Sequence, residues 1–287
     1  MVETHSVEKA EMEFNPQTQR RAWLPLTPSG VAAFAPASWF RVAQIQFVFA
    51  LVAASTFVWA FHSTWGVAFG EAIPRLPAAS GLQNGMLQWP GEHLVRLAEN
   101  RYVSIVGDLD ATGDLPSSSD FQIELGARQV RIRSLLGSAP IPYGVGWTVP
   151  LDRLEVSAWW GAWKPAVLAG LGLAVLLSLV AVWDLLALPY ALVVRLIALA
   201  GRRQLTLPGA WRIGAAAQLP GVFIGCAGLL AYATGRIDLV RLIWVMFLQF
   251  PLAWFLLVLA PFRLRPPPPS PSQPSSPNPF VGSQNLQ

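Results

Sequence analysis

The sequence predicts a membrane-embedded α-helical bundle of four transmembrane helices, with a β-rich or α+β domain inserted after the first helix. The chain is 53% hydrophobic and only 13% charged, well below the roughly 25% charge of soluble domains. Its 13 tryptophans also fit a bilayer protein, because the indole ring prefers the membrane interface. Between the first and second apolar runs, polar residues alternate with short apolar runs, which is typical of a folded domain outside the membrane.

The second apolar run, Pro165–Trp183, contains no charged residue. At about 1.5 Å per residue it nearly spans a hydrocarbon core of about 30 Å, and a helix satisfies all its backbone groups within lipid. Uncharged sequence continues beyond it, so transmembrane helix 2 is predicted at 163–203 with a kinked cytoplasmic extension. Pro189 favours the kink, because it removes an intrahelical hydrogen bond and clashes with the carbonyl of Leu185. We expect Tyr190–Ala200 to leave the membrane-spanning axis.

Three further transmembrane helices are predicted at 42–62, 213–235 and 242–262, each between basic side chains. In the third, Gly221 and Gly225 match a small-residue motif that permits close helix packing. The residues that bound these three helices are Arg41 and His62, Arg212 and Arg236, and Arg241 and Arg263.

The segments outside these helices are polar or rich in proline. Residues 1–23 are predicted to be a disordered cytoplasmic N-terminus. Residues 24–41 form an interfacial approach segment with a short helix, in which Thr27 is the N-cap and Pro28 the first helical residue. Residues 263–287 are predicted to be a disordered Pro/Ser-rich tail, because the proline run ends the fourth helix.

Arginine placement predicts the orientation. With four spans, most arginines near the helix ends fall on one side, which the positive-inside rule makes cytoplasmic. Only Arg236 and Arg241 oppose this, and Asp238 lies between them. We therefore expect a bacterial cytoplasmic (inner) membrane protein with both termini cytoplasmic and the inserted domain extracytoplasmic. The arginines on the predicted cytoplasmic side are Arg20, Arg21, Arg41, Arg195, Arg202, Arg203, Arg212, Arg263 and Arg265.

The inserted domain is predicted at 63–160 and is long enough to form its own small core. Its short apolar runs show period-2 alternation, which is typical of strands with one wet face. Gly126 suggests a hairpin turn between two of them, and Glu92–Arg101 is predicted to be a short helix. The predicted runs are Leu82–Leu87, Tyr102–Leu109, Phe121–Leu125 and Gln129–Leu135.

Three short motifs lie within this layout: Asn84-Gly85-Met86-Leu87, Val103–Gly113, and Arg202–Thr206 followed by Trp211-Arg212. Together with the order of parts over residues 24–265, they resemble an uncharacterised bacterial multi-pass membrane-protein family that includes maltodextrin-utilisation proteins. The first is similar to that family's short strand near the start of its exported domain, and the second to its apolar strand ending in an Asp-Thr-Gly-type turn. The third is similar to its basic entry to the third helix. The resemblance implies the topology and a link to carbohydrate uptake, and it brings no catalytic residues.

Catalytic and metal chemistry are mostly rejected. The stretch Asp108–Asp114 begins like a calcium loop, with oxygens at positions one, three and five (Asp108, Asp110 and Thr112), Gly113 at six and Asp114 after it. The twelfth position is Ser119 where a bidentate glutamate belongs, so we interpret this stretch as a turn. His93 is the only histidine in the inserted domain, and it has no metal-ligand partner at helical spacing. We expect no enzyme activity, no cofactor and no nucleic-acid partner.

Asp184, Gln218 and Gln249 are the candidate intramembrane polar site, because polar groups within membrane segments are costly. Asp184 either takes part in an ion or substrate relay or lies at the cytoplasmic end of its helix, hydrated or bonded to a neighbouring group, and we favour the second. We expect an interaction or sensing module, or an accessory subunit, whose partners are the lipid bilayer and other membrane or envelope proteins. The alternative is a small transporter or permease component.

Overall fold

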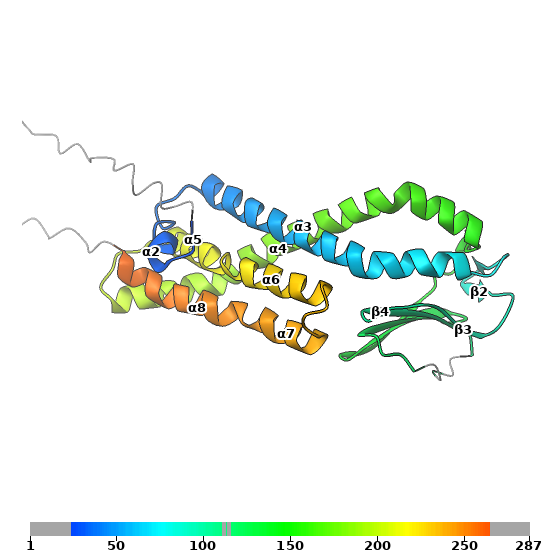
Figure 1. The fold of residues 1–287 in the computed structure, drawn as a ribbon. Helices are drawn as coiled ribbons and strands as arrows, with labels where there is room; N and C mark the ends of the chain where they lie inside the picture. Colours follow the sequence, from blue (N-terminus) through cyan, green and yellow to red (C-terminus); the bar gives the residue numbers. More distant parts are fainter. Residues whose placement is uncertain (1–23, 111–112, 114–115, 265–287) are drawn as a thin grey trace, which may run out of the picture. The chain divides into compact units, whose positions relative to one another are not determined.

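The computed structural model describes residues 24–110, 113 and 116–264 (Figure 1). Four of its helical stretches are long and apolar enough to cross a membrane: Trp39–Arg75, Arg153–Ala200, Leu207–Ala233 and Leu239–Arg263. Two β-sheets accompany them, so the predicted combination of four apolar helices and a β-containing segment is confirmed. The predictions for 1–23, for Asp114 and for the tail from 265 lie outside the described residues.

The described chain divides into two compact units. One contains 24–45, 183–220 and 252–264; the other contains 46–182 and 221–251. In the first unit, helix α2 (Pro28–Ala32) begins as predicted, because the Thr27 hydroxyl accepts a hydrogen bond from the amide of Gly30 at 3.1 Å. The rings of Trp39 and Trp211 stack with their centroids 4.3 Å apart in the same unit.

Helix α3 (Trp39–Ala72) continues well past its predicted end at 62 and spans about 51 Å. The hydroxyls of Ser63 and Thr64 do not interrupt it, because both donate to the carbonyl of Ala60 within the helix. The predicted start of the inserted domain at 63 therefore lies inside a helix. The last turns of α3 become part of the inserted domain's core.

The inserted domain contains two sheets. The larger has the strand order β3-β4-β5-β6-β7, in which only the β4–β5 pair is parallel. The smaller has the order β2-β1-β8 and is antiparallel. The strands are β1 (Gly81–Gln83), β2 (Met86–Gln88), β3 (Leu94–Glu99), β4 (Val103–Asp108), β5 (Phe121–Leu125), β6 (Gln129–Ser134), β7 (Gly137–Pro142) and β8 (Thr148–Pro150).

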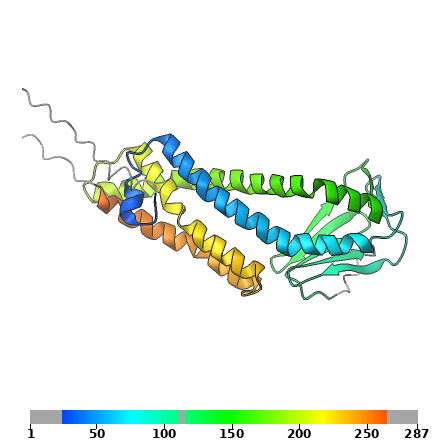
Figure 2. The ribbon, with the colours of Figure 1, turned by 45° about the horizontal axis from the view of Figure 1, so that its top comes forward.

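One face of the large sheet is apolar and packs against the last turns of α3 (Figure 2). Ala68 and Ala72 supply a flat helix surface, so the strands approach it closely. A β-bulge after Arg96 buries the two consecutive residues Leu97 and Ala98 on this side. The buried core consists of Ala68, Ala72, Leu87, Trp89, Leu97, Ala98, Val103 and Ile105.

Two sequence predictions about the inserted domain are wrong. Glu92–Arg101 is not a helix but contains strand β3, because the bulge hides the period-2 alternation that identifies a strand. Asn84-Gly85 is not part of a strand but the turn between β1 and β2, with φ of 51° and 75°. This dipeptide is a strong hairpin signal. The predicted hairpin at Gly126 is confirmed by the antiparallel β5–β6 pair.

Helix α4 (Arg153–Ala200) is one unbroken helix of 48 residues, about 72 Å long. It begins earlier than the predicted 163, because the carboxylate of Asp152 accepts hydrogen bonds from the amides of Leu154 and Glu155 and caps the helix. No interruption of the helix occurs at Pro189. The departure of Tyr190–Ala200 from the membrane axis stays a prediction.

The third and fourth apolar stretches are each divided into two helices, and a proline lies at or shortly after each break. The third consists of α5 (Leu207–Gln218) and α6 (Gly221–Ala233), and Pro220 lies between them. It begins at Leu207 and not at 213, because the Thr206 hydroxyl caps the amide of Gly209. The fourth consists of α7 (Leu239–Phe247) and α8 (Gln249–Leu259), followed by η2 (Ala260–Arg263). Pro251 explains its interruption, because proline clashes with the carbonyl four residues earlier.

The bulge residue Leu97 provides a test of the α3–sheet core. Its side chain is fully buried, so Leu97→Ala is expected to destabilise the inserted domain by about 2–5 kcal/mol. Urea unfolding of the full-length protein in micelles, followed by pulse proteolysis of the domain, measures the loss. Val145→Ala is the control, because Val145 is 96% exposed. Equal unfolding midpoints for the two variants would contradict the described core.

Candidate functional site

The turn between α6 and α7 is closed at both ends by local hydrogen bonds. Gly235 has a φ of 74° and donates to the carbonyl of Tyr232, and Arg236 donates to the carbonyl of Ala231. These two bonds form a Schellman motif, which glycine permits because it adopts positive φ without strain. Asp238 then caps α7 by accepting from the amide of Arg241 at 2.8 Å.

Two consecutive residues of the β3–β4 turn bind the carbonyls at this end of α6. The Tyr102 hydroxyl lies 3.1 Å from the carbonyl oxygen of Tyr232 and 2.9 Å from that of Ala233. The Arg101 guanidinium donates to the carbonyls of Gly235 at 2.7 Å and Ile237 at 2.9 Å. The last carbonyls of a helix have no intrahelical donors, and a cation there also interacts favourably with the helix dipole. The inserted domain thus caps α6.

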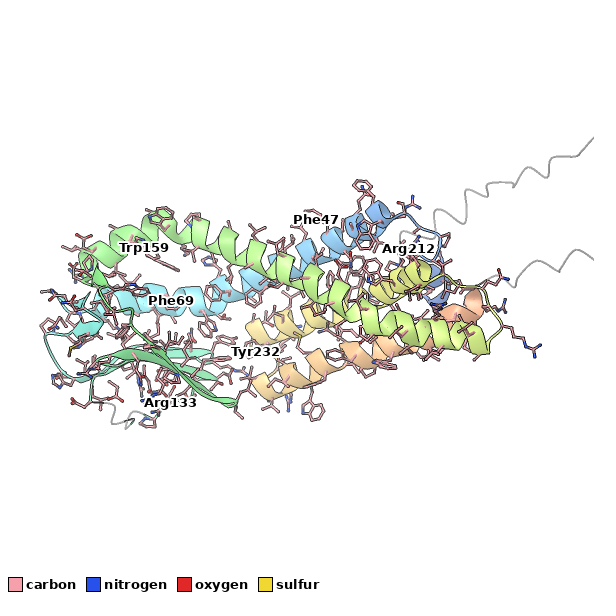
Figure 3. The ribbon with its side chains drawn as sticks, turned by 180° about the vertical axis from the view of Figure 1, so that it is seen from behind. Phe47, Phe69, Arg133, Trp159, Arg212 and Tyr232 are labelled. Carbon is pink, nitrogen blue, oxygen red and sulfur yellow. The ribbon has the colours of Figure 1, made fainter. Side chains whose placement is uncertain are left out.

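A third residue of the inserted domain, Asp120, which immediately precedes β5, binds the same helix end. Tyr232 lies at the end of α6 that faces the sheet (Figure 3), and its hydroxyl donates to the Asp120 carboxylate at 2.7 Å. The rings of Tyr102 and Tyr232 meet edge to face with centroids 5.1 Å apart. Leu239 and Leu242 of α7 complete a small apolar cluster around Tyr232. We name Arg101, Tyr102, Asp120, Tyr232 and the turn 234–238 the docking cluster.

Asn100 fixes the β3–β4 turn that carries Arg101 and Tyr102. Its side-chain oxygen accepts from the amides of Tyr102 and Val103, both at 2.9 Å. Its side-chain amide donates to the carbonyl of Thr64 in α3 at 2.9 Å. One side chain therefore links α3 to the turn that binds α6.

The outer face of the large sheet carries charged residues. Glu124, whose side chain is 4% exposed, forms ion pairs with Arg133 at 2.9 Å and Arg131 at 3.4 Å. The register places Glu124 opposite Arg131, next to the carboxyl end of β4. A cavity of about 350 Å³ opens beside them. Its lining residues are Asp108, Leu109, Glu124, Gly126, Ala127, Arg128, Gln129 and Arg131.

Several of the residues considered for a calcium loop lie in a turn within the described chain. The Asp108 carboxylate accepts a hydrogen bond from the amide of Gly113 at 2.8 Å. Asp110 lies 3.2 Å from His93 Nδ1, and both side chains are exposed. Among residues 24–110, 113 and 116–264, no three His, Cys, Asp or Glu side chains come together in a way that could hold a metal ion.

Of the predicted intramembrane polar site, the structure brings Asp184 and Gln218 near each other. The Gln218 amide donates to the carbonyls of Trp183 at 3.0 Å and Gly214 at 3.2 Å, so it binds the residue next to Asp184. Gln218 is buried and Asp184 is half-buried. A Cβ atom on Gly214 would come within 3.2 Å of the Ala187 carbonyl, so this glycine allows α5 to approach α4 closely.

Gln249 belongs to the other compact unit. Its side chain lies against two glycines of α6: a Cβ atom on Gly221 would come within 3.1 Å of Gln249 Cβ, and one on Gly225 within 2.9 Å of Gln249 Nε2. Its amide lies 3.2 Å from the sulfur of Met246. The two predicted packing glycines therefore accommodate a polar side chain at the break between α7 and α8.

Sequence reasoning missed the docking cluster. Its residues come from strand ends and a helix end that are far apart in the sequence, and no spacing rule joins them. The available signals were local: Gly235 followed by Asp238 marks a helix stop and a helix start. Asn100 and Arg101 gave no such signal once Glu92–Arg101 was interpreted as helical, and Tyr102 was interpreted as the first residue of a strand.

No protein-family model matches the chain, and neither a curated protein nor a solved structure matches it.

The Asp120–Tyr232 hydrogen bond can be measured by a double-mutant cycle. A bond between a hydroxyl and a carboxylate is stronger than a neutral one, so Asp120→Ala and Tyr232→Phe are expected to show a coupling energy of about 1–2 kcal/mol. Urea unfolding of the full-length protein in micelles supplies the four free energies. Full additivity would mean that the two side chains do not interact.

Tyr143 provides the matched control for that cycle. Its hydroxyl donates to the carbonyl of Gly126 at 3.1 Å, and burial raises the pKa of this phenol to about 12. Tyr143→Phe removes a hydroxyl from the same domain without touching the docking cluster, so it should be additive with Asp120→Ala.

Proposed function

We propose that the protein is a multi-pass bacterial inner-membrane protein that presents an extracytoplasmic interaction or sensing domain, or acts as an accessory subunit. The proposal rests on the docking cluster. Two hydrogen bonds from Arg101, and one from the Tyr102 hydroxyl shared between two carbonyls, attach the inserted domain to the end of α6 and to the turn that leads into α7. A binding event on such a domain acts directly on α6 and α7.

The contacts within each unit support the predicted topology. Arg101 binds the turn 234–238, and Tyr102 and Asp120 bind the last residues of α6, which requires the inserted domain and this end of α6 to lie on the same side of a membrane. In the other unit, Arg212 binds the carbonyl of Ala37, and Arg203 binds the carbonyl of Leu264 at 2.7 Å. These contacts join segments that are all predicted to be cytoplasmic: the approach segment before α3, the region between α4 and α5, and the end of the fourth apolar stretch. A chain with four spans places these segments on one side of the membrane and the inserted domain on the other.

The cavity beside Glu124 supports the sensing form of the proposal. It combines two carboxylates with two guanidinium groups at the carboxyl ends of the parallel strands β4 and β5. Polar groups converging on a concave site are typical of small-molecule binding. A ligand that carries both an acidic and a basic group would complement it.

Transport is the alternative function, with a link to carbohydrate uptake as one form suggested by the family resemblance. The buried amide of Gln218 beside half-buried Asp184 favours it, because polar side chains within membrane segments often line substrate pathways. If the protein is an interaction module, the hydrogen bonds of Gln218 next to Asp184 only hold α5 against α4.

Cysteine labelling in intact cells tests the layout on which the proposal depends. In a Cys226→Ser background, Ser118→Cys is expected to react with a membrane-impermeant maleimide added outside. Gln204→Cys, in the loop between α4 and α5, should react only after permeabilisation. Labelling of both positions from outside would contradict the proposal.

Purification from cell membranes distinguishes the interaction function from the transport function. Purification of the native chain and of an Asp184→Asn, Gln218→Leu variant from their own membranes should recover the same bound envelope protein if the inserted domain makes the interaction. Loss of that protein from the variant would place the interaction at the polar pair and contradict the proposal.

A further inference from the structure

The turn between β6 and β7 has an unusual composition. Ser134 pairs with Gly137, so Leu135 and Leu136 form a two-residue turn. Such turns favour Asn, Asp and Gly, whose side chains suit the backbone geometry and water. Here the two leucines are 69% and 81% exposed. Two adjacent exposed leucines at a hairpin tip indicate an apolar partner.

Strand register places this turn at the end of the sheet that carries the docking cluster. Ser134 lies opposite Phe121, and Phe121 lies beside Val103. Tyr102 and Asp120 immediately precede Val103 and Phe121 in the sequence. With strands about 4.8 Å apart, the leucine turn lies within about 10 Å of Asp120 across the sheet. Figure 1 shows this end of the sheet facing the α6–α7 turn.

The docking cluster also fixes the level of this end relative to the apolar helices. Tyr232, which binds Asp120, is the penultimate residue of the apolar stretch Leu207–Ala233. The next apolar stretch begins at Leu239, and its exposed Trp244 suits a membrane interface. The leucine turn is therefore at the height where the hydrocarbon region ends. Arg236 in the α6–α7 turn and Arg241 in the first turn of α7 are exposed and can bind lipid phosphates, and Arg241 also lies 3.6 Å from the Asp238 carboxylate.

The free edge of β7 argues against a protein strand as the partner. The Tyr143 amide donates to the carbonyl of Arg128, so the odd-numbered residues of β7 direct their amides toward β6. The even-numbered residues face the free edge, where Pro140 and Pro142 have no amide hydrogen. Prolines at such positions block strand addition.

We propose that the Leu135–Leu136 turn inserts into the outer interface of the lipid bilayer and anchors the inserted domain to the membrane surface. The proposal rests on the membrane-spanning layout proposed above. The anchor holds the β6–β7 hairpin, and Arg101 and Tyr102 hold the β3–β4 turn at the same end of the sheet, so the domain has two attachments to the membrane region.

Depth-dependent quenching tests the insertion. Single cysteines are placed at Leu136, Val145 and Ala174 in a Cys226→Ser background and labelled with an environment-sensitive fluorophore. The full-length protein is reconstituted in vesicles of phosphatidylethanolamine and phosphatidylglycerol, with or without brominated acyl chains. We expect blue-shifted emission and strong quenching at position 136.

The labels at Val145 and Ala174 are the controls that show which proposal a negative result would contradict. Val145 is at the opposite end of β7 and should show water-like emission without quenching. Ala174 lies on an exposed face within α4 and should be quenched. Quenching at 174 without quenching at 136 would overturn the proposed insertion of the Leu135–Leu136 turn but would leave the membrane-spanning layout intact. Absence of quenching at both would overturn the membrane-spanning layout as well.

Discussion

The arrangement of the inserted domain depends on the hydrogen bonds of the Asn100 side chain. Its oxygen organises the β3–β4 turn, and its amide binds the Thr64 carbonyl in α3. That turn presents Arg101 and Tyr102 to the carbonyl end of α6. Because a helix end needs external donors, the domain satisfies a requirement of the helix while the helix positions the domain. The two depend on each other.

Helix α3 belongs both to the predicted membrane region and to the core of the inserted domain. The apolar part of α3 is suited to lipid, and the same helix continues without interruption to the turns that cover the sheet. The apolar face of the five-stranded sheet needs a second layer to cover it. With Ala68 and Ala72 against it, the sheet gains its second layer. The domain is therefore built partly from a candidate membrane helix and is not an independent insertion.

The sequence predicted the four apolar helices because hydropathy and length are local properties. It also predicted the Thr27 cap and the Gly126 hairpin, since turn and cap chemistry is local too. It failed for β3, where a bulge removed the alternation, and for the end of α3, where His62 suggests the far membrane interface although the helix continues to Ala72. The docking cluster could not be predicted, because Arg101, Asp120 and Tyr232 meet only through tertiary packing.

Hydrogen–deuterium exchange of an Asn100→Ala variant in lipid nanodiscs tests the central claim most directly. If Asn100 organises the docking cluster, exchange should rise in the peptide covering 232–240, which loses the donors of Arg101 and Tyr102. Exchange in β6 and β7 (Gln129–Pro142) should stay at the native level. Native exchange at 232–240 in this variant would contradict the account, because α6 would then not depend on the inserted domain for its cap.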